Sequence, residues 1–136
     1  MKILYTAHAT AKGGRIGHVE TDDKLLAFDL VKPWENTGKK GTNPEQLFAC
    51  GYAACFGGAI EHVAKQDNIH VVGTTVNADV SFIQEDKGGF KLGVELKVHI
   101  PNVNQAMAEK LVQEAHQICP YSKATRNNIE VKLTVI

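Results

Sequence analysis

Hydrophobic and polar residues alternate along six segments of the chain, a pattern that favours β-strands with one buried face. Long alternating runs cover residues 3–11, 75–82, 92–100 and 129–135, and two shorter runs, 19–21 and 25–30, flank a turn at Asp22-Asp23. Because each run has one apolar and one polar face, we expect antiparallel strands that turn one face to a core and the other to water.

A helix is predicted to follow Asn43, which is a favourable N-cap residue. Pro44 suits the first helical position, and Gln46 stands at the spacing of a capping box. Residues 47–60 are apolar or small on every side of a helix. We therefore expect this helix to be buried all round and to end before Asn68.

Three glycines, Gly51, Gly57 and Gly58, interrupt the apolar helix. A glycine inside a helix costs about 1 kcal/mol, so such positions are better explained by another backbone that packs closely there. One small sheet cannot cover a helix on every side. The glycines therefore predict that the protein is a dimer.

A second helix is predicted from about Asn102, with a capping-box spacing to Gln105, and it should stop at Pro120. Five of its residues share one stripe at helical spacing: Ala108, Leu111, Val112, Ala115 and Cys119. Residues 32–42 form a loop that is long enough to be functional. The predicted order is β-β-β-α-β-β-α-β, an α+β fold with antiparallel sheets around a long buried central helix, in one domain over residues 1–136.

The charge balance narrows the classes of partner. Lysine and arginine together number 15, as do aspartate and glutamate, so the formal charge is zero. This balance argues against nucleic acids and acidic membranes as main partners, because both reward a basic excess. The uncharged stretch 46–60 is shorter than the roughly 20 residues of a spanning helix. The first residues lack the apolar segment of a signal peptide, so we expect a cytoplasmic protein.

The chain has three cysteines, Cys50, Cys55 and Cys119, and no Cys-x-x-Cys pair. An odd number in a cytoplasmic protein argues against a framework of structural disulfides. Two interpretations stay open from the residues alone. The cysteines are small buried hydrophobic side chains, or one of them is a reactive thiol that a nearby cation activates.

Only two arginines, Arg15 and Arg126, are available to activate a thiol. Arg15 stands in a glycine-containing loop, where its side chain could fold inward toward Cys55 or remain an exposed charge. Glu45, in the first turn of the first helix, could orient this arginine or could simply favour the positive end of the helix dipole.

Cys119 lies at the end of the second helix, where a thiol can move more easily than in mid-helix. This place suits a cysteine that approaches another to form a disulfide, although a core residue at the last position of the stripe would fit as well. His116 and Cys119 are three residues apart and could face one metal ion together, but no second close pair accompanies them.

Two long motifs resemble those of the OsmC/Ohr family. The first is Asn43-Pro44-Glu45-Gln46-Leu47-Phe48-Ala49 followed by Gly51-Tyr52-Ala53-Ala54-Cys55-Phe56, and the second is Ile118-Cys119-Pro120-Tyr121-Ser122-Lys123-Ala124-Thr125-Arg126. The tyrosine after Cys-Pro and the N-terminal Gly13-Gly14-Arg15 are similar to the organic hydroperoxide resistance branch. The resemblance covers essentially the whole chain.

The resemblance implies an intertwined homodimer, with sites at the subunit interface, that reduces organic hydroperoxides, including those of the fatty-acid type, to alcohols. By motif position, Cys55 would be the peroxidatic thiol that becomes a sulfenic acid, and Cys119 the resolving thiol of an intramolecular disulfide. Arg15 and Glu45 would be the activating pair. The family implies no bound cofactor and an external dithiol reductant, dihydrolipoamide or a lipoylated protein.

Three positions depart from the family pattern. Cys50 stands where a small residue such as alanine is usual, and it adds a competing disulfide partner. Asn127 follows the motif arginine where glycine is common, and Asp23-Lys24 replaces the usual Asp-Gly of the hairpin. Asparagine tolerates the left-handed conformation, so we expect the turn at Asn127 to survive.

Two other classes of function remain. A non-catalytic module could bind a small molecule in the same apolar dimer groove. A hydrolase or transferase with a cysteine nucleophile would need a nearby general base, and no histidine stands in either motif. For the peroxidase, we expect an apolar pocket involving Phe48, Phe56 and the Pro33-Trp34 loop to favour organic peroxides over hydrogen peroxide.

Overall fold

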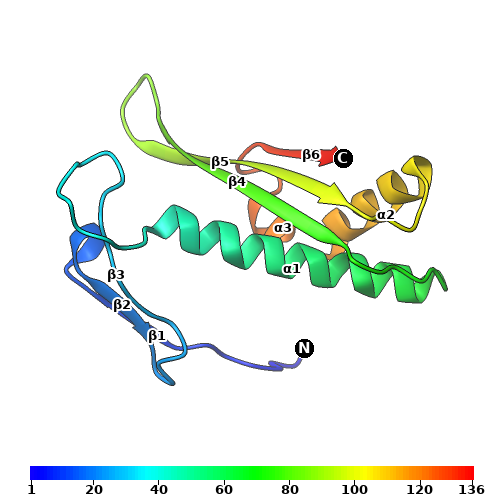
Figure 1. The fold of residues 1–136 in the computed structure, drawn as a ribbon, viewed down its shortest axis with the longest axis horizontal. Helices are drawn as coiled ribbons and strands as arrows, with labels where there is room; N and C mark the ends of the chain where they lie inside the picture. The colour runs from blue at the N-terminus through cyan, green and yellow to red at the C-terminus, as the bar shows by residue number, and fades with distance from the viewer. The chain divides into compact units, whose positions relative to one another are not determined.

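The computed structural model describes residues 1–136, and the backbone divides into two compact units, Met1–Leu47 and Phe48–Ile136. The elements follow in the order β1 (Ala9–Lys12), a 3-10 turn η1 (Gly14–Ile16), β2 (His18–Thr21), β3 (Ala27–Asp29), α1 (Pro44–Gln66), β4 (Thr75–Gln84), β5 (Phe90–His99), α2 (Gln105–Ile118), α3 (Pro120–Thr125) and β6 (Val131–Val135) (Figure 1). This order confirms the predicted α+β fold and adds η1 and α3. The single domain over residues 1–136 stays a prediction.

In the first unit, β1, β2 and β3 form an antiparallel sheet with β2 in the middle. The first strand is shorter than the predicted 3–11, because β2 supplies only four residues and its pairing with β1 ends at Ala9 opposite Thr21. Residues 1–8 are exposed and belong to no strand. The alternating pattern therefore predicted a strand that is too long at its N-terminal end, where the residues pair with no other strand of this unit.

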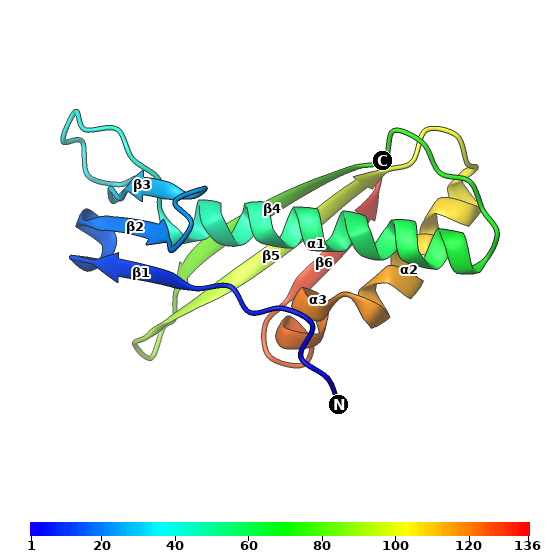
Figure 2. The ribbon, with the colours of Figure 1, turned by 90° about the horizontal axis from the view of Figure 1, so that it is seen from below.

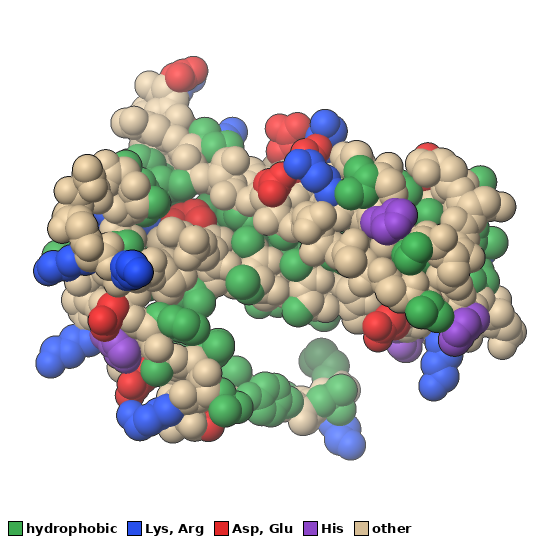
Figure 3. Space-filling model, viewed as in Figure 1, with side chains coloured by type: hydrophobic (Ala, Val, Ile, Leu, Met, Phe, Trp, Pro, Cys, Tyr) green, Lys and Arg blue, Asp and Glu red, His purple; other side chains and the backbone are tan.

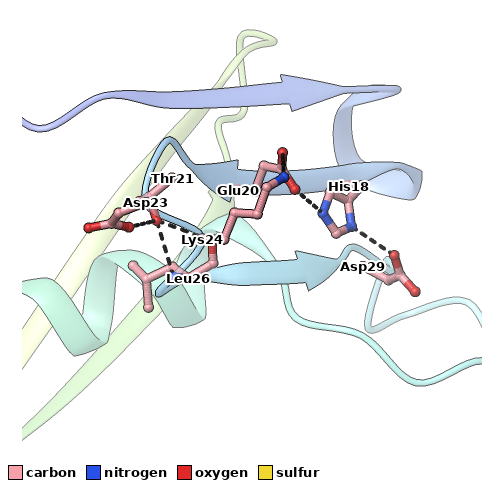
Figure 4. Close-up of polar contacts among 7 residues, drawn as sticks. All are labelled: His18, Glu20, Thr21, Asp23, Lys24, Leu26 and Asp29. Atoms are coloured by element: carbon pink, nitrogen blue, oxygen red, sulfur yellow. Dashed lines mark hydrogen bonds and ion pairs between the residues drawn. The ribbon is translucent and has the colours of Figure 1, made fainter.

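The hairpin between β2 and β3 turns where the sequence predicted it, with a lysine in place of the usual glycine. Lys24 has a φ of 61°, in the left-handed region that lysine adopts only at a cost. Polar contacts around the turn offset this cost (Figure 4). The Thr21 hydroxyl donates to Asp23, Lys24 donates to Glu20, and Glu20 also contacts the His18 ring.

In the second unit, β4, β5 and β6 form a sheet in that order. The β4–β5 pair is an antiparallel hairpin, as predicted, but β5 and β6 pair in parallel, so the expectation of purely antiparallel strands is wrong. The cause is the connection between them. The chain leaves β5, passes through α2 and α3, and re-enters the sheet in the same direction, as parallel neighbours require.

One face of this sheet carries the hydrophobic core. Alternate β5 residues Val94, Leu96 and Val98 are buried in one cluster with α1 and α2. Figures 1 and 2 show α1 running along the sheet with α3 beside it. Between these β5 positions stand the charged side chains of Glu95 and Lys97, which pair with Lys132 and Asp79 at the surface. The second unit is thus one sheet with helices over one face.

The N-terminus of α1 forms as predicted, because the Asn43 side chain accepts a hydrogen bond from the backbone N–H of Gln46 at 2.9 Å. Within a single chain α1 is buried along one side, so burial on every side stays a prediction that depends on the expected dimer. The buried residues of α1 form a single stripe: Tyr52, Phe56, Ala59, Ile60, Val63 and Ala64. Cys50, Ala54 and Gly58 are exposed, and Figure 3 shows hydrophobic and neutral atoms without charge along the middle of the helix.

The length argument against a membrane span does not hold for α1. The helix has 23 residues, because it continues through Glu61 and Lys65, and it is long and apolar enough to cross a membrane by length and composition. The core helix of a globular protein can also be this long and apolar, and 33% of the most apolar stretch of α1 is buried inside the fold. Length is therefore weak evidence for a spanning helix here.

Three asparagines near the ends of the α2–α3 region have different roles. Asn104 caps α2 through the backbone N–H of Met107, so the predicted start at Asn102 is two residues early. Asn102 instead holds the preceding loop, accepting from Val72 N–H and donating to the His70 carbonyl. After α3, Asn127 adopts a φ of 62°, which confirms the predicted left-handed turn.

Candidate active site

Two of the three cysteines lie next to each other in the second unit. The Cys119 thiol points at the Cys55 sulfur, with 3.5 Å between the two sulfur atoms. Both are free thiols, and so is Cys50, which is exposed on α1. A disulfide needs an S–S distance of about 2.05 Å, so a shift of about 1.5 Å would join the pair.

Cys119 sits at a joint between two helices. It is the C-cap of α2 and the N-cap of α3, with backbone angles of φ −59° and ψ 123°, and it is fully buried. Pro120 explains the joint, because proline cannot continue α2 but suits the first position of a new helix. The predicted stop is therefore confirmed, and the same proline also starts α3.

The surroundings of Cys55 disfavour its thiolate within the second unit. Burial raises the pKa of the Cys55 thiol, and the neighbouring Cys119 raises it further, while the backbone N–H of Tyr121 lowers it by donating a hydrogen bond. No cation of the second unit is among these causes. A reactive thiolate at Cys55 therefore needs a positive charge from elsewhere.

Arg15 and Glu45 form a two-pronged ion pair in the first unit. The two guanidinium nitrogens donate to the two carboxylate oxygens at 2.9 and 2.6 Å. The hydrogen bond from Arg15 lowers the pKa of Glu45, and Glu45 in turn raises the pKa of Arg15. The Arg15 guanidinium also lies 5.8 Å from the centre of the Trp34 ring. The four predicted site residues thus form two pairs, each within its own unit.

A buried polar cluster that sequence reasoning missed joins α1 to the α2–α3 region. The Tyr52 hydroxyl lies 2.8 Å from the Ser122 hydroxyl and 3.1 Å from that of Thr125. Ser122 also lies 2.8 Å from Nδ1 of His116. Tyr52, Ser122 and Thr125 all belong to the two cysteine motifs, but no local pattern indicates which polar groups meet. The position of His116 also weakens the metal interpretation, because Nδ1 is engaged with Ser122.

A pocket of about 850 Å³ lies in the second unit beside the start of α3. Its wall is mixed: the apolar and aromatic residues are Phe48, Phe90, Leu92, Pro120, Tyr121, Ala124 and Ile129, and the polar ones are Glu85, Lys91, Thr125 and Asn128. Phe48 was expected in such a pocket. Phe56 was also expected there but is fully buried in the core, because it falls on the stripe of α1 that faces the sheet. No group of three or more His, Cys, Asp or Glu side chains is arranged to hold a metal ion.

Comparison with known proteins places this arrangement in a family. The OsmC-like protein family model matches residues 37–134. The chain is 53% identical over 132 residues to the organic hydroperoxide resistance protein OhrB of Bacillus subtilis, covering 96% of each chain. It is 50% identical to an organic hydroperoxide resistance protein of Xanthomonas axonopodis, covering 98% of this chain and 96% of the relative.

Solved structures agree with the sequence comparison. The crystal structure of Bacillus subtilis OhrB matches with a TM-score of 0.95 at 51% identity, covering 98% of this chain and 100% of that one. An organic hydroperoxide resistance protein from Legionella pneumophila matches with a TM-score of 0.92 at 52% identity, covering 98% of both chains. The chain therefore belongs to the OsmC family, among the organic hydroperoxide resistance proteins.

Proposed function

We propose that this protein is a thiol peroxidase that reduces organic hydroperoxides to alcohols and so protects against organic peroxide stress. One observation carries the proposal. Two free thiols from separate motifs, Cys55 and Cys119, stand with their sulfur atoms 3.5 Å apart. The names of relatives at about half identity support the same class of substrate.

The proposed reaction has two chemical steps. The Cys55 thiolate attacks the distal oxygen of the hydroperoxide, the O–O bond breaks, and the alkoxide leaves as an alcohol after taking one proton. Cys55 then carries a sulfenic acid. The Cys119 thiol condenses with it, forming the S–S bond and releasing water. This second step protects Cys55 from further oxidation.

Arg15 is the proposed source of the positive charge that Cys55 lacks. Its guanidinium would stabilise the thiolate and the negative charge on the oxygens during transfer, and Glu45 would hold it in orientation. In the proposed homodimer the sites lie at the subunit interface. The exposed, uncharged face of α1 supports a second copy as its cover, because such a face is costly to leave in water.

The 850 Å³ pocket is the proposed place for the organic group of the peroxide. The apolar part of its wall includes Pro120 and Tyr121, the residues directly after Cys119. Apolar burial favours an alkyl or acyl chain and gives hydrogen peroxide no advantage. We propose hydroperoxides of the fatty-acid type among the substrates.

An external dithiol completes the proposed cycle. Dihydrolipoamide or a lipoylated protein would attack the Cys55–Cys119 disulfide through a mixed disulfide, regenerating both thiols and leaving as a cyclic disulfide. No bound cofactor is needed for these steps. A reducing dithiol pool fits the proposed cytoplasmic location.

A thiol count with one equivalent of organic hydroperoxide tests the proposal. The peroxidase loses two thiols rapidly, and peptide mapping finds a Cys55–Cys119 bridge. A non-catalytic module that binds a small molecule in its apolar groove would lose none, and a dominant Cys50–Cys55 bridge would contradict the assigned pairing. Turnover is then compared with dihydrolipoamide, thioredoxin and glutathione as reductants.

A further inference from the structure

The buried polar cluster beside the two cysteines is a directed chain of hydrogen bonds. The Thr125 hydroxyl donates to the Ser122 carbonyl at 3.2 Å, so towards Tyr52 it can only accept. Each hydroxyl has one proton to donate. Tyr52 therefore donates to Thr125 and accepts from Ser122, and the Ser122 hydroxyl accepts in turn from His116 Nδ1–H.

The direction of these hydrogen bonds determines which atom of each group carries the proton. His116 must carry its proton on Nδ1, and burial together with nearby Arg126 lowers the pKa of His116, which favours the neutral ring. Tyr52 and Ser122 are fully buried, and Thr125 is 4% exposed. No water can replace a lost partner at such positions without new space, so each bond is costly to remove.

The hydrogen bonds between Tyr52 and Ser122 lie beside the contact between the two cysteine sulfurs. Tyr52 precedes Cys55 by three residues on α1, and Ser122 follows Cys119 by three residues on the other side. Residues three apart on a helix are neighbours on its surface, so the Tyr52–Ser122 contact lies about one turn from the sulfur contact. On the α2 side of the joint, Arg126 donates to the His116 carbonyl at 2.9 Å. Both helices that flank Cys119 are thus anchored by polar contacts.

We propose that Tyr52 is a positioning residue for the resolving step, acting by holding the joint at Cys119 against α1. This inference rests on the proposed function. In that step the Cys119 thiol displaces the hydroxyl of the Cys55 sulfenic acid, the S–S bond forms, and one water leaves. The Tyr52 hydroxyl touches neither sulfur. Its role is to keep the two sulfur atoms within about 1.5 Å of bonding distance until the sulfenic acid has reacted.

Tyr52→Phe removes only the hydroxyl and tests this role. We expect Cys55 to consume one equivalent of organic hydroperoxide at the wild-type rate, because Tyr52 is fully buried and does not line the pocket. Disulfide formation should slow by about tenfold, the rate equivalent of about 1.4 kcal/mol. The longer-lived sulfenic acid should react more with dimedone and form more sulfinic acid under excess peroxide. Rapid quenching followed by mass spectrometry measures both steps.

Two further variants provide a comparison. Ser122→Ala removes the hydroxyl that bonds to Tyr52 and does not line the pocket, so it should repeat the split between the two steps, with less than additive slowing when combined with Tyr52→Phe. Thr74→Val removes a buried hydroxyl that has no hydrogen-bond partner, so it should change neither step. Circular dichroism confirms that each variant is folded.

The outcomes separate this inference from the proposed function. If wild-type protein forms no Cys55–Cys119 disulfide with peroxide, the proposed function fails. If wild type forms it and Tyr52→Phe does so at the same rate, only the positioning role is overturned. Equal slowing of both steps in Tyr52→Phe, or the same split in Thr74→Val, would also overturn it, since a general loss of packing would then explain the effect.

Discussion

Gly58 on α1 offers a test of the proposed homodimer, with Gly51 as its counterpart. The two glycines are seven residues apart and so lie on nearly the same face of the helix. A Cβ atom at Gly51 would lie 2.5 Å from the Tyr121 hydroxyl oxygen and 3.0 Å from the ring carbon that carries it. A Cβ atom at Gly58 would have nothing within 4 Å in this chain. Gly51 is therefore closely packed, although against a side chain and not against the backbone that the sequence predicted, while Gly58 has no such neighbour within this chain.

The expected magnitudes follow from these distances. Glycine to alanine in a helix stabilises the folded state by about 1 kcal/mol. At Gly58 nothing opposes this gain within one chain, so an isolated chain with Gly58→Ala should unfold about 4 °C higher. At Gly51 the Tyr121 hydroxyl must move by about 1 Å, and overpacking costs about 1–3 kcal/mol, so Gly51→Ala should be neutral or destabilising.

A homodimer reverses the expectation for Gly58. If a second copy packs its backbone on this face, two added methyl groups overpack each interface, and the dimer dissociation constant should rise by at least about tenfold. Sedimentation over a range of protein concentrations measures it, and thermal unfolding at the same concentrations measures stability. A variant that dimerises as wild type does and gains the full 4 °C would refute the argument that Gly58 lies at the subunit contact.

Three further predictions concern the site. Cys119→Ser should still reduce one equivalent of organic hydroperoxide but lose turnover with a dithiol, whereas Cys55→Ser should lose both, as a peroxide consumption assay will show. Arg15→Ala should raise the pKa of Cys55 and slow peroxide reduction, Arg15→Lys should restore only part of the rate, and Glu45→Gln should be milder; the pH dependence of Cys55 alkylation measures each. Because the pKa of Glu45 is lowered in the fold, its ion pair should contribute to stability above about pH 4.3 and lose that contribution as the pH falls through the lowered value. Denaturant unfolding between pH 3 and 7 should show a smaller loss of stability at acid pH in Arg15→Ala than in wild type, and not its absence, because other carboxyl groups with lowered pKa values titrate in both proteins.

The sequence predicted those parts of the fold that depend on neighbours along the chain. The N-cap at Asn43, the break at Pro120 and the left-handed turn at Asn127 each follow from the chemistry of one or two residues. The long strands were also predicted, because one buried face requires alternation. The parallel pairing of β5 with β6 was missed, since alternation is the same in either direction and only the path through α2 and α3 decides it.

The same distinction applies to the site. The two cysteines and the Arg15–Glu45 pair were predicted from motifs, and the structure brings the members of each pair together. The chain through Tyr52 and Ser122 was not predicted, because it joins residues 70 positions apart whose types are common in cores. Phe56 was misassigned to the pocket for the opposite reason. Its place in the motif suggested substrate contact, whereas its angle on α1 turns it to the sheet.

The state of Cys55 explains why a second element is needed for the proposed chemistry. Within its own unit, burial and Cys119 oppose the thiolate, and only one backbone N–H supports it. Of the two arginines in the chain, Arg126 is engaged with the His116 carbonyl and does not contribute to the Cys55 balance. Arg15 is therefore the arginine that we propose shifts the thiol toward its reactive form, because the thiolate is the species that attacks the peroxide.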